Sequence, residues 1–139
     1  MLTEMHAHIL RLINQSGPLS RTELVRQLGV SKASMSALAA DLIERGMLTE
    51  GEVVYGAGRP SVRLELAASS AFFIGVSLAS APFIVRLTDL HGTVVGEAIM
   101  ADGTGADDIA AGIGAVVDRL IADKGVERGR LAGIGIAIP

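Results

Sequence analysis

The chain has 139 residues, with twelve Lys or Arg, fifteen Asp or Glu and no cysteine. Because cysteine is absent, the sequence excludes a disulfide framework and thiolate metal sites, and it fits a reducing cytoplasm. The net charge of −3 does not point to a nucleic-acid partner, but residues 1–66 balance seven cationic against seven acidic side chains. A local basic face, which DNA binding needs more than a basic total, can therefore exist there.

The first thirty residues predict two helices. Apolar side chains at helical spacing indicate a helix from about residue 2 to 15, and Ser16-Gly17-Pro18 ends it. Ser20 and Glu23 have the spacing of a capping box, which opens a second helix. Gly29 is suited to end that helix, because glycine tolerates the left-handed conformation of a helix terminus.

A third helix follows almost immediately. Ser31 is a good N-cap, and the apolar pattern then predicts a helix from Lys32 to about Arg45, closed by Gly46. Two helices joined by so short a turn, the first ending in glycine, have the helix-turn-helix arrangement.

Helical periodicity gives way to strand periodicity after Gly46. Residues 47–50 and 53–55 predict a strand, residues 56–60 a loop and residues 62–66 a returning strand with alternating apolar side chains. This hairpin is the wing of a winged helix-turn-helix domain, which we place at residues 1–66.

The second half has a different pattern. Residues 67–70 form a short linker of small side chains. Beyond it we expect strands at 71–78, 82–89 and 93–100, a helix at about 105–123 and a last strand at 131–138. That last strand is apolar almost throughout, so we expect it to be buried on both faces. Since nothing follows to cover the second face, the sequence looks truncated.

Residues 66–85 carry no charge over a length that could span a membrane. Serines, Gly75 and Pro82 interrupt this stretch, and its large apolar residues form two clusters. Two buried strands joined by a turn explain the pattern better than a membrane helix, so we expect no membrane partner.

These segments resemble the ROK family, which groups bacterial sugar-responsive repressors with sugar kinases. Residues 17–36 resemble the repressors' DNA-binding segment, and Gly58-Arg59-Pro60 resembles their wing and linker. Residues 73–76 and 133–139 resemble the opening and fourth strands of the family's actin-like, ribonuclease-H-like lobe. The resemblance implies an α+β multi-domain fold, with residues 71–139 as the truncated start of the sensor domain.

The resemblance also implies a function. The chain would be the N-terminal fragment of a cytoplasmic regulator of the N-acetylglucosamine and xylose repressor type, in a protein more than twice this long. Such a repressor of carbohydrate genes binds operator DNA as a homodimer or higher homo-oligomer. Its sensor domain responds to a sugar or sugar phosphate, and no cofactor is expected.

The third helix is the candidate for the major groove, because its N-terminal residues would meet base edges and phosphates. Arg59 in the wing loop suits the narrow, negative minor groove of A·T-rich DNA. Each of these residues could instead be an ordinary solvated side chain, and the winged helix could serve protein contacts. The candidate DNA-binding residues are Arg21, Arg26, Ser31, Lys32, Ser34, Ser36 and Arg59.

The alternative function is that of an ATP-dependent sugar kinase with a fused DNA-binding domain. Kinases of the family open their phosphate site with Asp-x-Gly-Gly-Thr, whereas this chain has Ser77-Leu78-Ala79-Ser80-Ala81. A hydroxyl cannot replace the aspartate's negative charge, so we expect no catalytic residues. His6, His8 and His91 form no metal-binding pattern, so we expect no metal site.

Overall fold

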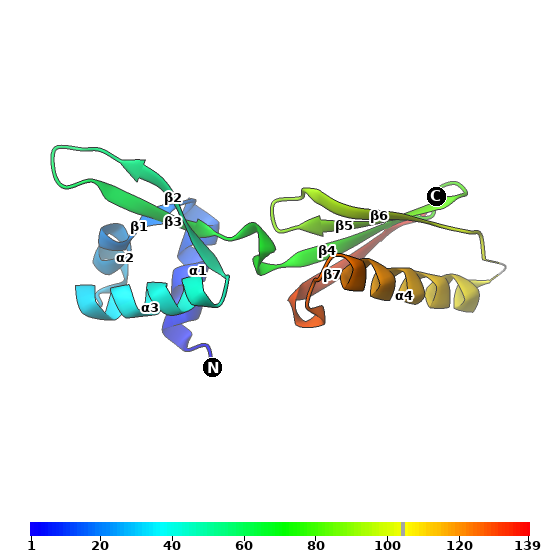
Figure 1. Ribbon diagram of the computed structural model, residues 1–139, viewed down its shortest axis with the longest axis horizontal. Coiled ribbons are helices and arrows are strands. Elements are labelled where there is room, and N and C mark those ends of the chain that lie inside the picture. The colour runs from blue at the N-terminus through cyan, green and yellow to red at the C-terminus, as the bar shows by residue number, and fades with distance from the viewer. Residues whose placement is uncertain (104) are drawn as a thin grey trace. The chain divides into compact units, whose positions relative to one another are not determined.

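The computed structural model describes residues 1–103 and 105–139, which divide into two compact units, Met1–Ser70 and Ala71–Pro139. The first unit contains three helices and a small antiparallel sheet of strand order β1-β3-β2 (Figure 1). Its elements are α1 (Glu4–Ser16), β1 (Leu19–Ser20), α2 (Arg21–Leu28), α3 (Lys32–Glu44), β2 (Leu48–Val54) and β3 (Ser61–Leu66). This is a winged helix-turn-helix, as predicted.

The first unit folds around side chains that the helical and strand periods place on one side of each element. All three helices and all three strands contribute, and aliphatic residues fill the core without an aromatic ring. The short strand β1, which the sequence analysis did not foresee, pairs Leu19 with Leu64 and joins the helices to the wing. The buried residues are Ile9, Ile13, Leu19, Leu24, Met35, Ala39, Leu42, Leu48 and Leu64.

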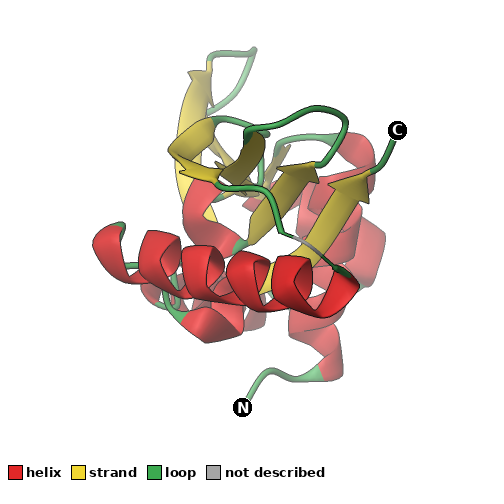
Figure 2. Cartoon of the chain, turned by 90° about the vertical axis from the view of Figure 1, so that its right-hand side faces the viewer, coloured by secondary structure: helices red, strands yellow, loops and turns green. Residues whose placement is uncertain are grey.

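The second unit is a four-stranded mixed sheet with one helix. The strand order is β6-β5-β4-β7, in which β4 and β7 run parallel and the other neighbours antiparallel. Figure 2 shows helix α4 lying along one face of this sheet. The elements are β4 (Phe72–Ser77), β5 (Phe83–Asp89), β6 (Val94–Met100), α4 (Ala106–Asp123) and β7 (Leu131–Ala137), with a single 3₁₀ turn at Arg128–Arg130 before β7. Another 3₁₀ turn, at Ala68–Ser70, ends the first unit.

Helix α4 packs closely over β5 and β6. Five of its apolar residues are buried against the inward side chains of the sheet, among them Val117 and Leu120. The helix contains glycines, which weaken an isolated helix, and one of them has a packing reason. A Cβ on Gly112 would lie 2.8 Å from the Sδ of Met100, so this glycine lets the helix approach the sheet.

The prediction that the last strand is buried on both faces is wrong for this structure. Ile134 and Ile136 of β7 point to the same side as Ile74 and Val76, with which they pair, but they are 51% and 53% exposed. The reason is geometric: β7 is the outer strand of the sheet, and α4 covers β5 and β6 instead.

The uncharged stretch of residues 66–85 forms β4 and the start of β5, so it is not a membrane helix. Among residues 1–103 and 105–139, none of the helices combines the length and the apolar character that crossing a bilayer requires.

Candidate nucleic-acid interface

The turn between α2 and α3 is built by local hydrogen bonds. At the start of α2, the Ser20 backbone N–H donates to the Glu23 carboxylate at 2.7 Å, and the Glu23 N–H donates to the Ser20 hydroxyl at 3.2 Å. The Ser20 backbone bond lowers the pKa of Glu23, because it stabilises the ionised carboxylate. Gly29 ends α2 in the left-handed conformation with φ of 68°, which favours glycine.

Ser31 caps α3 with its side chain. Its hydroxyl accepts from the Ser34 N–H at 3.1 Å and donates to the Ser34 hydroxyl at 2.9 Å. Both candidate serines are therefore engaged with each other, although both side chains stay exposed. Their role in this structure is to fix the first turn of α3, and any contact with DNA would be shared with that role.

The exposed face of α3 consists largely of small side chains. Lys32 and Ser36 are exposed, but they lie to one side of the face opposite the buried Met35, Ala39 and Leu42. The residues that point directly outward are three alanines and, at the end of the helix, an acid: Ala33, Ala37, Ala40 and Glu44. Apart from the carboxylate of Glu44 at the end of the helix, the exposed side-chain donors and acceptors thus stand near its beginning, at Lys32, Ser34 and Ser36.

Lys32 stands in the first turn of α3, where no acidic residue is present. A cation there opposes the helix dipole, whose positive end lies at the N-terminus. No ion pair to Lys32 is found within the part of the chain that the structure describes. An exposed positive charge beside free backbone N–H groups is a favourable place for an anion such as phosphate.

The two candidate arginines of α2 differ in their surroundings. Arg21 is tied to Glu50 of β2 at 2.8 Å between Nη2 and Oε1, whereas Arg26 is exposed. Arg63, which the sequence analysis missed, donates from Nη1 to the Pro18 carbonyl oxygen at 2.7 Å. Arg21 and Arg63 therefore brace the wing against the helices, and Arg26 is the better placed of the α2 pair to meet phosphate.

The wing is the hairpin of β2 and β3, whose register shifts between Glu50 and Val53. Its loop, residues 55–60, is exposed throughout and includes Arg59. The sequence analysis ended the first wing strand at Tyr55, but β2 ends at Val54, and Tyr55 stands at the loop with 79% of its surface exposed. Tyr55 is thus an exposed aromatic residue in the same loop as Arg59 that the sequence analysis did not single out.

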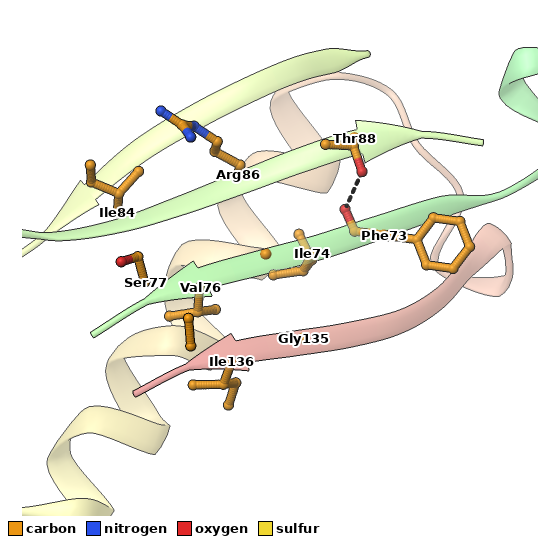
Figure 3. A pocket seen from close by; sticks show the side chains of 11 residues that line it. Phe73, Ile74, Val76, Ser77, Ile84, Arg86, Thr88, Gly135 and Ile136 are labelled. Atoms are coloured by element: carbon orange, nitrogen blue, oxygen red, sulfur yellow. Dashed lines mark hydrogen bonds between the residues drawn. The ribbon is translucent and has the colours of Figure 1, made fainter. Parts of the chain in front are cut away.

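The sheet of the second unit has an open face with a shallow pocket of about 740 Å³ (Figure 3). Its one charged lining residue, Arg86, donates to the carboxylate of Glu97 at 2.6 Å. Ser77, at the end of β4, also lines this pocket. None of the described lining residues is acidic, and the Glu97 carboxylate that meets Arg86 is engaged in that ion pair, so the lining offers no free carboxylate to hold a metal–nucleotide complex. Across residues 1–103 and 105–139, no group of three or more His, Cys, Asp or Glu could hold a metal ion.

Comparison with known proteins finds similarity to transcriptional regulators. A model of the MarR family matches residues 2–59, which lie in the winged unit. The chain is 32% identical over 92 residues to the DNA-binding transcriptional dual regulator NagC of Escherichia coli K12, covering 66% of this chain and 23% of NagC. It is 28% identical over 91 residues to the DNA-binding transcriptional repressor Mlc of the same strain, covering 64% of this chain and 22% of Mlc.

A solved structure extends the similarity to both units. The crystal structure of a ROK family transcriptional regulator, a homologue of E. coli Mlc, aligns with 96% of this chain and 35% of its own, with a TM-score of 0.58 and 24% identity. The chain is thus similar in sequence and in fold to the N-terminal part of ROK family transcriptional regulators. It spans between 22% and 35% of the length of these three regulators, and it has the winged helix and the partial α/β lobe found in the N-terminal part of the ROK structure.

Proposed function

We propose that this chain carries the operator-binding part of a transcriptional repressor, with α3 in the major groove of duplex DNA and the wing at the adjacent minor groove. The observation that carries the proposal is the first turn of α3. Lys32 stands there against the helix dipole, and its side chain is exposed. A DNA phosphate would turn this unfavourable placement into a favourable one.

The wing supports the same assignment. Its loop is exposed and carries Arg59, the side chain suited to a narrow minor groove. The acids Glu50 and Glu52 in β2 are also exposed, and they would repel phosphates. We therefore assign DNA contact to the loop and not to the base of the hairpin.

Binding of the 139-residue chain to duplexes from the upstream region of its own gene cluster tests the proposal. We expect weak binding that prefers these duplexes, measured by fluorescence anisotropy against unrelated competitor DNA. The substitution Lys32→Ala should weaken this binding. The control substitution Arg119→Ala, which removes an exposed arginine on α4, should leave it unchanged. If Lys32→Ala binds as tightly as the wild-type chain, α3 does not enter the groove as proposed. If the wild-type chain shows no preference for its own upstream region, a protein-binding role of the winged unit is favoured.

We further propose that the whole protein is a cytoplasmic homo-oligomer that senses a sugar or sugar phosphate. The support is the similarity to ROK family regulators together with the name "N-acetylglucosamine repressor" carried by several E. coli and Shigella relatives. Calorimetric titration of the longer protein with hexoses and hexose phosphates, in the presence of its operator, tests this proposal. An operator affinity that no sugar changes would contradict it.

We do not assign phosphoryl transfer to this chain. The relatives NagC and Mlc are regulators, and Ser77 supplies a hydroxyl where a kinase of this family needs a carboxylate. ATP consumption with a panel of hexoses is the direct test, and turnover above background would favour the kinase alternative.

A further inference from the structure

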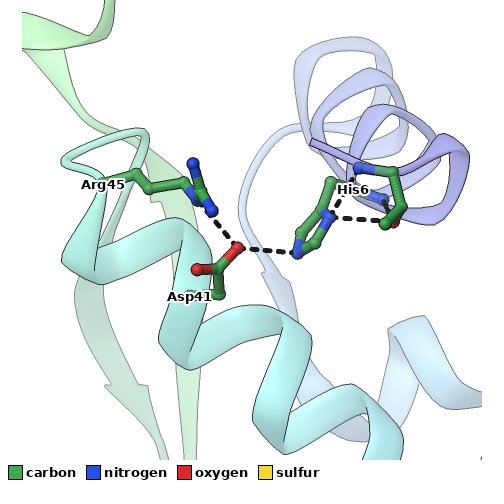
Figure 4. Close-up of polar contacts among 4 residues, drawn as sticks. His6, Asp41 and Arg45 are labelled. Carbon is green, nitrogen blue, oxygen red and sulfur yellow. Dashed lines mark hydrogen bonds and ion pairs between the residues drawn. The ribbon is translucent and has the colours of Figure 1, made fainter. Parts of the chain in front are cut away.

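His6 is a buried polar residue that the proposed function does not use. It lies at the third position of α1, with 6% of its surface exposed, and both of its ring nitrogens face polar partners (Figure 4). One partner, Thr3, precedes the same helix, and the other, Asp41, belongs to α3. The ring thus bridges the start of α1 and the helix that we place in the major groove.

The contacts on the Thr3 side determine which ring nitrogen carries the proton. The Thr3 backbone N–H donates to Nδ1 at 3.0 Å, and the Thr3 hydroxyl lies 2.8 Å from the same atom. The hydroxyl in turn accepts from the His6 N–H at 3.4 Å, which completes a capping box with histidine at the position usually held by Glu or Gln. A nitrogen that accepts from a backbone N–H cannot carry a proton, so the neutral ring is protonated at Nε2.

The contact on the other side suits that tautomer. Nε2 lies 3.0 Å from Oδ2 of Asp41, which is within ion-pair distance, but this buried atom makes no hydrogen bond of acceptable geometry to any described residue. Arg45 donates to the same oxygen at 2.8 Å, and this hydrogen bond lowers the pKa of Asp41. The carboxylate therefore stays ionised and holds the ring from α3. The positive amino terminus of Met1 also acts on Asp41.

We propose that His6 is a proton-sensitive positioning residue that joins α1 to α3. A second proton can enter the ring only at Nδ1, where it displaces the Thr3 N–H. The protonated Nδ1 can instead donate to the Thr3 hydroxyl 2.8 Å away, and the ring gains a positive charge beside the Asp41 carboxylate. Protonation therefore rearranges the cap of α1 and strengthens the attraction between the ring and α3. In the DNA-binding role, on which this consequence rests, the setting of α3 becomes dependent on pH.

Nuclear magnetic resonance tests the coupling between His6 and α3 without DNA. In ¹⁵N-labelled chain near neutral pH we expect His6 to be unprotonated at Nδ1 and protonated at Nε2. As the pH falls, the amides of Thr3 and of residues 41–45 shift together with the ring. His8, half-buried on the same helix, is the internal control, and changes at its ring should not be accompanied by shifts in α3. A proton on Nδ1 of the neutral ring, or a His6 titration that leaves Asp41 unmoved, overturns the proposal.

The variant His6→Gln distinguishes the helix-capping role of His6 from its contact with Asp41. Glutamine at this position of a capping box can still accept from the Thr3 N–H, so α1 keeps its cap and the unit its fold. It lacks the ring that reaches Asp41, so the co-titration of residues 41–45 disappears. If those residues still follow the same pH profile in His6→Gln, another group is responsible and the proposal fails.

Operator binding gives the second measurement, with wild type, His6→Gln and His8→Gln compared between roughly pH 6 and 8. Comparing variants at each pH cancels the general gain in affinity from added positive charge. We expect the ratio of wild-type to His6→Gln affinity to change about fivefold between the two ends of this pH range, the low end of typical coupling between sites. A ratio that is constant with pH refutes the link to DNA. Absence of binding by every variant refutes the proposed function. The resonance measurement still decides whether His6 couples α1 to α3.

Discussion

Replacing Lys32 with alanine tests the phosphate contact of α3, and the structure supplies a number for it. Arg21, Arg45 and Arg63 are each held by a neighbour within the first unit. The exposed cations that remain on α2, α3 and the wing are Arg26, Lys32 and Arg59. Each phosphate neutralised contributes about −0.9 to the slope of log affinity against log salt concentration, so one bound copy gives a slope no steeper than about −2.7.

Lys32→Ala should reduce that slope to about −1.8 per bound copy. The assay is fluorescence anisotropy with a fixed operator duplex between roughly 50 and 200 mM KCl, and Arg119→Ala is the control that keeps the wild-type slope. An unchanged slope in Lys32→Ala refutes the reasoning, because a residue that neutralises no phosphate releases no counterion. A wild-type slope much steeper than the limit shows that the internally held arginines leave their partners on DNA.

Arg59→Ala should flatten the preference for A·T-rich flanking sequence, and equal discrimination by both chains in competition binding contradicts the minor-groove role. Leu42→Ala should cost about 2–5 kcal/mol, because Leu42 is fully buried; a loss below about 1 kcal/mol in urea unfolding contradicts that packing. The pKa of Glu23 is lowered in the folded state, so its negative charge stabilises the fold at pH values above its ordinary pKa of 4.5. This stabilisation is lost as the pH falls through the folded-state pKa. Thermal unfolding should therefore favour wild type over Glu23→Gln at neutral pH but not in acid. Ile136→Lys should reduce self-association in sedimentation velocity, since β7 is an exposed apolar edge strand.

Features set by neighbours in sequence were predictable. The capping box of Ser20 and Glu23, the left-handed Gly29 and the cap at Ser31 all join residues no more than four apart. Their geometry follows from residue type and spacing, so the helix-turn-helix could be placed before any coordinates were known. The fold class was predicted correctly for the same reason, since strand alternation and helical periodicity are also local patterns.

Features set by distant residues were not predictable. Arg21 has the appearance of a phosphate contact in the sequence, but its partner Glu50 lies 29 residues away. His6 looked like one of three scattered histidines, yet it meets Asp41 across the unit. The sequence did contain a signal for the helix-capping role of His6, because Thr3 and His6 have capping-box spacing. Histidine is not the residue usually found at this position of the box. The exposure of β7 likewise depends on where α4 lies, which periodicity does not give.

The outward face of α3 limits what a single winged unit can select. Its central positions are alanines, which can touch a thymine methyl but cannot hydrogen-bond to a base edge. The cations that could meet phosphate are few, and phosphate contacts carry no sequence information. If the proposed function holds, specificity must come mainly from DNA shape at the wing and from two units that bind linked half-sites, because joining two weak sites raises the effective concentration of the second. In such an assembly, a small change in the setting of α3 alters both half-sites at once, which would let a single buried histidine have a measurable effect.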